Sequence, residues 1–137
     1  MQDMNERPKT FYEQEVERLT KEYGLPAHHY AYIRQSKAFM EKYHADKIEL
    51  NEMAAAACMS RFHYIRIFQQ VYGRTPRQFL RDLRIEKAKE LLKKGYPVTW
   101  VCFDVGYESL PTFSKVFKQG TGHSPKVYQQ LHISNPE

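Results

Sequence analysis

Two segments of the chain carry side chains suited to reading DNA, spaced as one face of a helix would space them. Arginine or lysine can reach guanine O6 and N7 in the major groove, and apolar groups can touch thymine methyls. A helix that presents such a mixture outward can enter that groove. Alternatively, Phe62 and Ile65 of the first segment pack on the N-terminal helices instead of facing DNA. The outward residues are Phe62, Ile65, Arg66 and Gln69 in the first segment, and Pro111, Ser114, Lys115 and Lys118 in the second.

The charge of the chain is unevenly distributed. The first 45 residues balance seven basic against seven acidic side chains, whereas residues 46–137 carry fourteen basic and nine acidic ones. A basic stretch of this kind is typical of nucleic-acid binders, although many domains without a polyanionic partner are equally basic.

Other chemistry finds little support among the residues. Cys58 and Cys102 lie far apart without a C-x-x-C spacing, and the six histidines lack H-x-x-x-H or H-E-x-x-H spacing, so we expect no disulfide, metal or cofactor. We find no catalytic motif and expect no catalytic residue and no enzyme activity. No signal peptide and no apolar run near the ~20 residues of a membrane span occur, which favours a cytoplasmic protein without a membrane partner.

Hydrophobic spacing and capping signals predict only helices, because no segment alternates with period two. Thr10 and Glu13 form a capping box for a first helix with an apolar stripe at Tyr12, Val16, Leu19 and Tyr23, followed by a turn at residues 26–29. A second helix runs over 30–44 with Ile33, Met40 and Tyr43 inward. Further helices are expected over 50–57, 61–72, 76–94, 99–105 and 110–119, and from Pro125 onward.

An internal repeat organises these helices. At a shift of 49, Ser60 pairs with Ser109 and Gly73 with Gly122, and just upstream a shift of 48 pairs Cys58 with Gly106. Each copy therefore reads as a short helix, a tight turn and a longer helix, which is a helix-turn-helix unit. The predicted core face of the longer helix holds Tyr64, Ile67, Phe68 and Val71 in the first copy, and Phe113, Val116, Phe117 and Gly120 in the second.

Several motifs together resemble a known family. They are Phe79-Leu80, Arg84-Ile85, Ala88, Leu91-Leu92, Val105-Gly106-Tyr107, Phe113-Ser114-Lys115-Val116-Phe117-Lys118, Gly122 and Ser124-Pro125. With them, residues 33–130 resemble the DNA-binding domain of the AraC/XylS family of bacterial transcription regulators. The resemblance implies an all-α fold of two helix-turn-helix subdomains joined by a linker helix of roughly 28 Å. The expected division is an N-terminal helical extension over 1–28 and an AraC-type domain over 29–132, with its first unit at 48–73, linker at 76–94 and second unit at 98–121.

The same resemblance suggests which side chains meet DNA. Base-reading candidates become Phe62, Ile65 and Arg66 in the first unit, and Leu110, Pro111, Ser114 and Lys115 in the second, with Lys118 on a phosphate. Arg61 and Gln69 are further DNA-binding candidates, and Arg74 and Arg77 at the start of the linker are expected on phosphates. Arg84 is expected to bridge linker and subdomain rather than to touch DNA.

Four positions depart from the family pattern. Cys102 replaces a small alanine and is expected as a packed residue, and Gln129 replaces an arginine. Leu110 and Pro111 stand where polar base contacts are frequent, so we expect the first unit to carry most of the specificity.

The predicted function is that of a sequence-specific transcription regulator, an activator reading two adjacent major-groove segments. Its partners would be double-stranded DNA and RNA polymerase, bound by a monomer, with self-association through the N-terminal helix as a second arrangement. The alternative is a helical protein-binding adaptor or anti-regulator without sequence-specific DNA readout.

Overall fold

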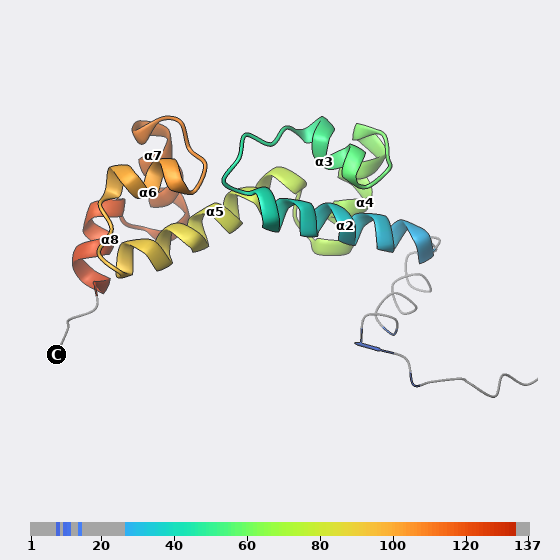
Figure 1. Ribbon diagram of the computed structural model, residues 1–137, viewed down its shortest axis with the longest axis horizontal. Coiled ribbons are helices and arrows are strands. Elements are labelled where there is room, and N and C mark those ends of the chain that lie inside the picture. The colour runs from blue at the N-terminus through green and yellow to red at the C-terminus, as the bar shows by residue number, and fades with distance from the viewer. Residues whose placement is uncertain (1–7, 9, 12–13, 15–26, 134–137) are drawn as a thin grey trace, which may run out of the picture.

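The computed structural model describes residues 27–133 together with Pro8, Thr10, Phe11 and Gln14, and residues 27–133 form seven helices and no strand (Figure 1). The helices are α2 (Ala27–Tyr43), α3 (Leu50–Ala56), α4 (Arg61–Tyr72), α5 (Pro76–Lys93), α6 (Val98–Asp104), α7 (Leu110–Thr121) and α8 (Pro125–His132). The all-α prediction is confirmed for this part of the chain. The apolar stripe predicted on the helix over 10–23, and most of that helix, lie outside the described residues.

Helix α5 connects two groups of helices. Figure 1 shows α2, α3 and α4 around its N-terminal part and α6, α7 and α8 around its C-terminal part. Phe79 and Leu80 of α5 belong to the first hydrophobic core, and Ile85, Ala88 and Leu92 belong to the second. Its 18 residues span about 27 Å. One rigid rod therefore contributes to both cores and sets the separation of the two units.

The two units repeat each other closely. Helices α4 and α7 each have twelve residues, begin at a serine N-cap and end at a glycine C-cap. Ser60 and Ser109 accept the backbone N–H groups of His63 and Thr112, which satisfies donors that a helix start otherwise leaves free. In the preceding turn of each unit, Cys58 and Gly106 both have positive φ, at 55° and 108°. The two shifts of the repeat, 49 and 48, are confirmed.

Two sequence expectations about α2 are wrong. His28 and His29 lie in the first turn of α2 rather than in a turn before it. Tyr43, expected inward, is exposed and packs on Phe39, with the ring centroids 5.1 Å apart.

The predicted core faces of α4 and α7 are also too long. Val71 and Val116 are only half-buried at the edges of their cores. Gly120 is exposed, and a Cβ there would come within 3.8 Å of Ile85 Cγ2. Val71 and Gly120 hold the i+7 position, two turns along each helix, where contact with the core thins out. Val116, at i+3, packs at the edge of the second core.

Within the described residues, no helix has the length and apolarity needed to cross a membrane. Nor does that part of the chain bring together three histidine, cysteine or acidic side chains suited to holding a metal ion.

Candidate nucleic-acid interface

Two buried hydrogen bonds link the core face of α4 to α2. The Tyr64 hydroxyl donates to Ser36 Oγ at 3.1 Å, and Ser36 Oγ donates to the Ile33 carbonyl of α2 at 2.7 Å. Burial raises the pKa of Tyr64 to about 12, so the phenol stays protonated and keeps its donor role. With Ile67 and Phe68 also buried, α4 keeps a fixed rotation about its own axis and its other face turns outward.

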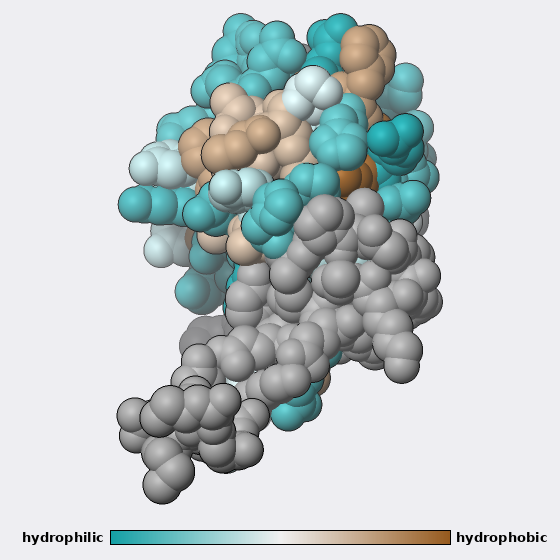
Figure 2. All heavy atoms as spheres, turned by 90° about the vertical axis from the view of Figure 1, so that its right-hand side faces the viewer, coloured by the Kyte–Doolittle hydropathy of each residue, from teal (hydrophilic) through white to brown (hydrophobic). Residues whose placement is uncertain are grey.

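The outer face of α4 presents the residues that the sequence singled out. Phe62 is 77% exposed, with the Arg61 guanidinium 5.3 Å from its ring centroid. Arg66 and Gln69 are exposed, and an Arg66 nitrogen lies 3.2 Å from His63 Nδ1. Phe62 does not pack into the domain, whereas Ile65 is half-buried. Figure 2, which views the α2–α4 end of the molecule, shows a surface patch of apolar side chains bordered by hydrophilic ones.

The outer face of α7 is smaller and less aromatic. Pro111, Lys115 and Lys118 are exposed, and Ser114 is half-buried. Leu110 is half-buried against the second core. Because Phe113 and Phe117 are fully buried, the two lysines point away from the core and supply the positive charge of this face.

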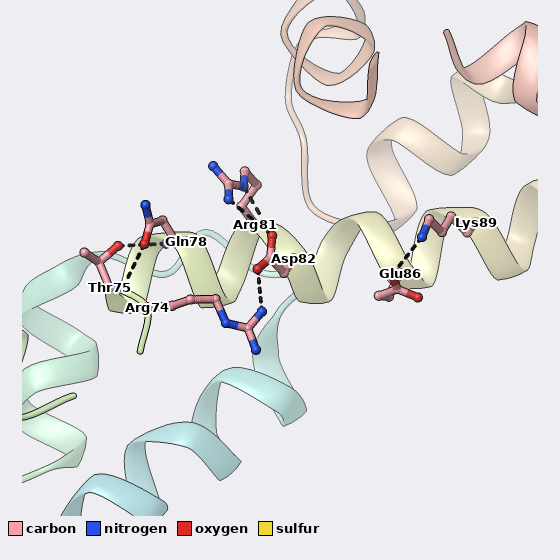
Figure 3. Close-up of polar contacts among 7 residues, drawn as sticks. All are labelled: Arg74, Thr75, Gln78, Arg81, Asp82, Glu86 and Lys89. Carbon is pink, nitrogen blue, oxygen red and sulfur yellow. Dashed lines mark hydrogen bonds and ion pairs between the residues drawn. The ribbon is translucent and has the colours of Figure 1, made fainter. Parts of the chain in front are cut away.

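The two arginines at the start of α5 differ in whether other side chains already engage their guanidinium groups. Arg74 pairs with Asp82 at 2.5 Å and lies over the Phe79 ring at 5.5 Å, so its charge is already partly compensated (Figure 3). Arg77 is exposed and makes no hydrogen bond, ion pair or ring contact within the part of the chain that the structure describes. Of the two arginines expected on phosphates, Arg77 is the one with an unengaged guanidinium.

Arg84 joins the two units. Its Nε donates to the His44 carbonyl at 2.7 Å and one terminal nitrogen donates to the Asp46 carbonyl at 2.9 Å, in the loop between α2 and α3. Its guanidinium also lies 5.5 Å from the ring centroid of Tyr107, in the turn of the second unit. Partial burial lowers the pKa of Arg84, and the charge interaction with Tyr107 acts in the opposite direction and raises it. The bridging role expected for Arg84 is confirmed.

Two departures from the family pattern also find an explanation. The Gln129 side-chain amide donates to the carbonyls of Leu92 and Tyr96, at 3.1 and 2.7 Å, and so ties α8 to the end of α5. Cys102 is fully buried, and burial raises the pKa of its thiol, as expected of a packed residue rather than a reactive one.

Two cationic side chains outside the predicted contact set lie beside this surface. Arg81 projects from α5 and shares the Asp82 carboxylate with Arg74 (Figure 3), and Lys47 pairs with Glu108 of the second unit at 3.8 Å. The signal for Arg81 was available, since Arg77, Arg81 and Arg84 follow each other at helical spacing and therefore share one side of α5. Nothing in the sequence marks Lys47.

Two capped helices with corresponding outer faces, carried by one connecting helix, define a double helix-turn-helix protein. Residues 53–131 match a family model described as a helix-turn-helix domain. The chain is 40% identical over 82 residues to an uncharacterized HTH-type transcriptional regulator of Haemophilus influenzae, covering 59% of this chain and 28% of that protein. It is 35% identical over 94 residues to the MmsAB operon regulatory protein of Pseudomonas aeruginosa, covering 68% of this chain and 31% of that one. The chain thus spans less than a third of the length of either relative.

The fold of the chain is also similar to that of solved structures. The C-terminal domain of AraT, a response regulator from Geobacillus stearothermophilus, superposes with a TM-score of 0.73 at 26% identity, covering 77% of this chain and 88% of that one. The DNA-binding domain of AdpA, a global transcriptional factor solved in complex with a target DNA, gives 0.70 at 27% identity, covering 72% and 90%. The chain belongs to the AraC-type helix-turn-helix family of DNA-binding domains.

Proposed function

We propose that this chain is a sequence-specific transcription regulator in which α4 and α7 read two adjacent major-groove segments on one face of a duplex. The observation that carries the proposal is the repeat in three dimensions: two helices of equal length, capped alike, expose corresponding residues from a shared rod. Recognition helices one DNA turn apart, near 34 Å, suit a rod of this size. The AdpA domain, solved with its target DNA, supports this reading by its likeness to the chain.

Within this proposal the residues take different roles. Arg66 has the reach and the donors for a guanine edge, and Phe62 and Ile65 offer apolar contact to thymine methyls. On α7, Pro111 and the half-buried Leu110 offer no hydrogen-bond donors from their side chains, which leaves Ser114 and Lys115 to meet base edges and Lys118 a phosphate. Arg61, Gln69, Arg74 and Arg77 complete the proposed contact set. The first unit then provides most of the sequence discrimination.

The proposal also covers the wider behaviour of the chain. It acts as a cytoplasmic DNA-binding protein without enzymatic activity or cofactor, binds its site as a monomer and activates transcription by recruiting RNA polymerase. One chain already carries both recognition helices, which is why a monomer can span a bipartite site.

Selection from a randomised duplex library at about 150 mM salt, followed by sequencing, tests the proposal. We expect two enriched boxes about ten base pairs apart. Arg66→Ala should flatten the preference within one box by about 1–3 kcal/mol per base pair, and Lys115→Ala should reduce discrimination less. A larger loss of discrimination with Lys115→Ala would refute the assignment of specificity to α4.

The salt dependence of binding separates this proposal from a protein-binding adaptor that uses the Phe62 face. Six to eight phosphate contacts predict a slope of log affinity against log salt of roughly −5 to −7. An apolar protein interface predicts a slope near zero. Folded protein that enriches no sequence would favour the adaptor.

A further inference from the structure

A groove between the two units connects the starts of their recognition helices. It consists of two adjoining clefts of about 420 and 330 Å³ that share Ile48, Arg84 and Tyr107 as lining residues. The larger cleft reaches Arg61, the first residue of α4. The smaller one reaches Ser109 and Thr112, at the start of α7. The groove therefore runs from one recognition helix to the other along α5.

Positive charge in the larger cleft exceeds the negative charge around it. Arg61, Arg77, Arg81 and Arg84 line it together with one carboxylate, that of Glu49, which forms the capping box of α3. The hydrogen bonds of Arg84 to backbone carbonyls leave its charge unneutralised. Arg77 makes no hydrogen bond, ion pair or ring contact within the described part of the chain.

The walls of the cleft strengthen this field. Met53 is fully buried and Leu80 is 6% exposed, so apolar side chains form part of the lining beneath the guanidinium groups. Charges beside low-dielectric walls attract a counter-ion more strongly than the same charges in open water. Arginine also presents several donors in a planar fork that matches phosphate oxygens. A phosphate is the ligand that this lining fits.

The position of the groove identifies the source of that phosphate. A strand whose major-groove edges are read by α4 and then by α7 has to cross from one helix to the other, and the groove occupies that interval. We infer that the groove binds the phosphodiester groups of the DNA strand crossing between the two boxes. This inference rests on the proposed function and extends it to a site built by both units, since Tyr107 belongs to the second unit and the four arginines to α4 and α5.

The test uses Arg77→Gln and Arg81→Gln, singly and together, with Lys87→Gln as the matched control. Lys87 lies on the same helix, pairs with Glu90 and does not line the groove. Arg77 and Arg81 are exposed, so we expect all four variants to keep the wild-type unfolding curve. Each groove substitution should weaken binding roughly tenfold for selected and unselected duplexes alike, and lower the salt slope by about 1. Lys87→Gln should leave both quantities unchanged.

Methylphosphonate substitution then locates the phosphates. Neutralising a phosphate between the two boxes should weaken wild-type binding and have little further effect on the double variant. Phosphates outside the boxes should give equal losses in both proteins. An additive loss at every position between the boxes would overturn the inference.

Two further outcomes separate this inference from the proposed function. A wild-type chain that enriches no sequence refutes the proposed function, while the variants on unselected duplex still report on the groove. Calorimetric titration with inorganic pyrophosphate tests whether the groove instead binds a soluble phosphate ligand. Sub-millimolar binding that the double variant loses, together with unchanged DNA affinity in that variant, would assign the groove to a soluble phosphate ligand and overturn the inference.

Discussion

Replacing Gly106 with alanine should destabilise the protein where its two units meet. Gly106 has a φ of +108°, and a Cβ there would lie 2.8 Å from the His44 carbonyl oxygen, 3.0 Å from Arg84 Nε and 3.1 Å from the Ala45 carbonyl oxygen. Two of these neighbours are backbone atoms, which cannot move aside as a flexible side chain can. The same position accommodates the guanidinium that joins α5 to the loop between α2 and α3.

The size of the effect follows from two costs. A left-handed backbone costs an L-residue roughly 1–2 kcal/mol. Forcing a methyl group into a packed contact costs roughly 1–3 kcal/mol more. We therefore expect Gly106→Ala to lower the free energy of unfolding by about 3 kcal/mol and the Tm by roughly 10 °C. The domain should still fold at room temperature, since natural stabilities are about 5–15 kcal/mol.

Gly73→Ala is the matched control for this experiment. Gly73 also has a positive φ, +72°, but a Cβ there would meet nothing within 4 Å, so its replacement carries the backbone cost alone. Urea and thermal unfolding followed by far-UV circular dichroism give both free energies. The difference between the two variants, about 2 kcal/mol, isolates the contact between the units. Equal destabilisation of the two variants would refute the close approach at Gly106.

Two further predictions concern buried polar groups. Arg84→Met should cost about 2–3 kcal/mol in urea unfolding, because it removes charge-assisted hydrogen bonds to the carbonyls of His44 and Asp46; a loss below about 0.5 kcal/mol would contradict the bridging role. The pKa of Tyr64 is about 12 in the folded protein and about 10 in an unfolded chain, so its contribution to stability is complete below pH 10 and falls as pH rises toward 12. Tyr64→Phe should lose that part of the pH dependence and about 1 kcal/mol from the hydrogen bond to Ser36. An equal fall in the free energy of unfolding between pH 10 and 12 in both proteins would contradict the assignment.

Much of the fold could be predicted from local signals. Thr75 and Gln78, which stand at capping-box spacing, exchange hydrogen bonds of 3.0 and 3.1 Å where α5 begins. The core residues closest to the helix start, such as Tyr64 and Phe113, are buried as their spacing predicts. Predictions weakened toward helix ends, as at Gly120, because helical periodicity places a residue on a face without showing how far the neighbouring element extends.

In the candidate interface, too, some features depend on local sequence and others on the tertiary structure. The sequence by itself determined the helices, their caps, the repeat and the residues on the outer faces of α4 and α7, since these depend on groups a few positions apart. Only the tertiary structure decided how the units meet, with Arg84 on carbonyls 40 and 38 residues away and Gln129 on the carbonyl of Leu92. The groove between the units belongs to this second class. The physical reason is that a carbonyl oxygen is the same in every residue, so no side-chain pattern records which of them a distant guanidinium or amide will reach.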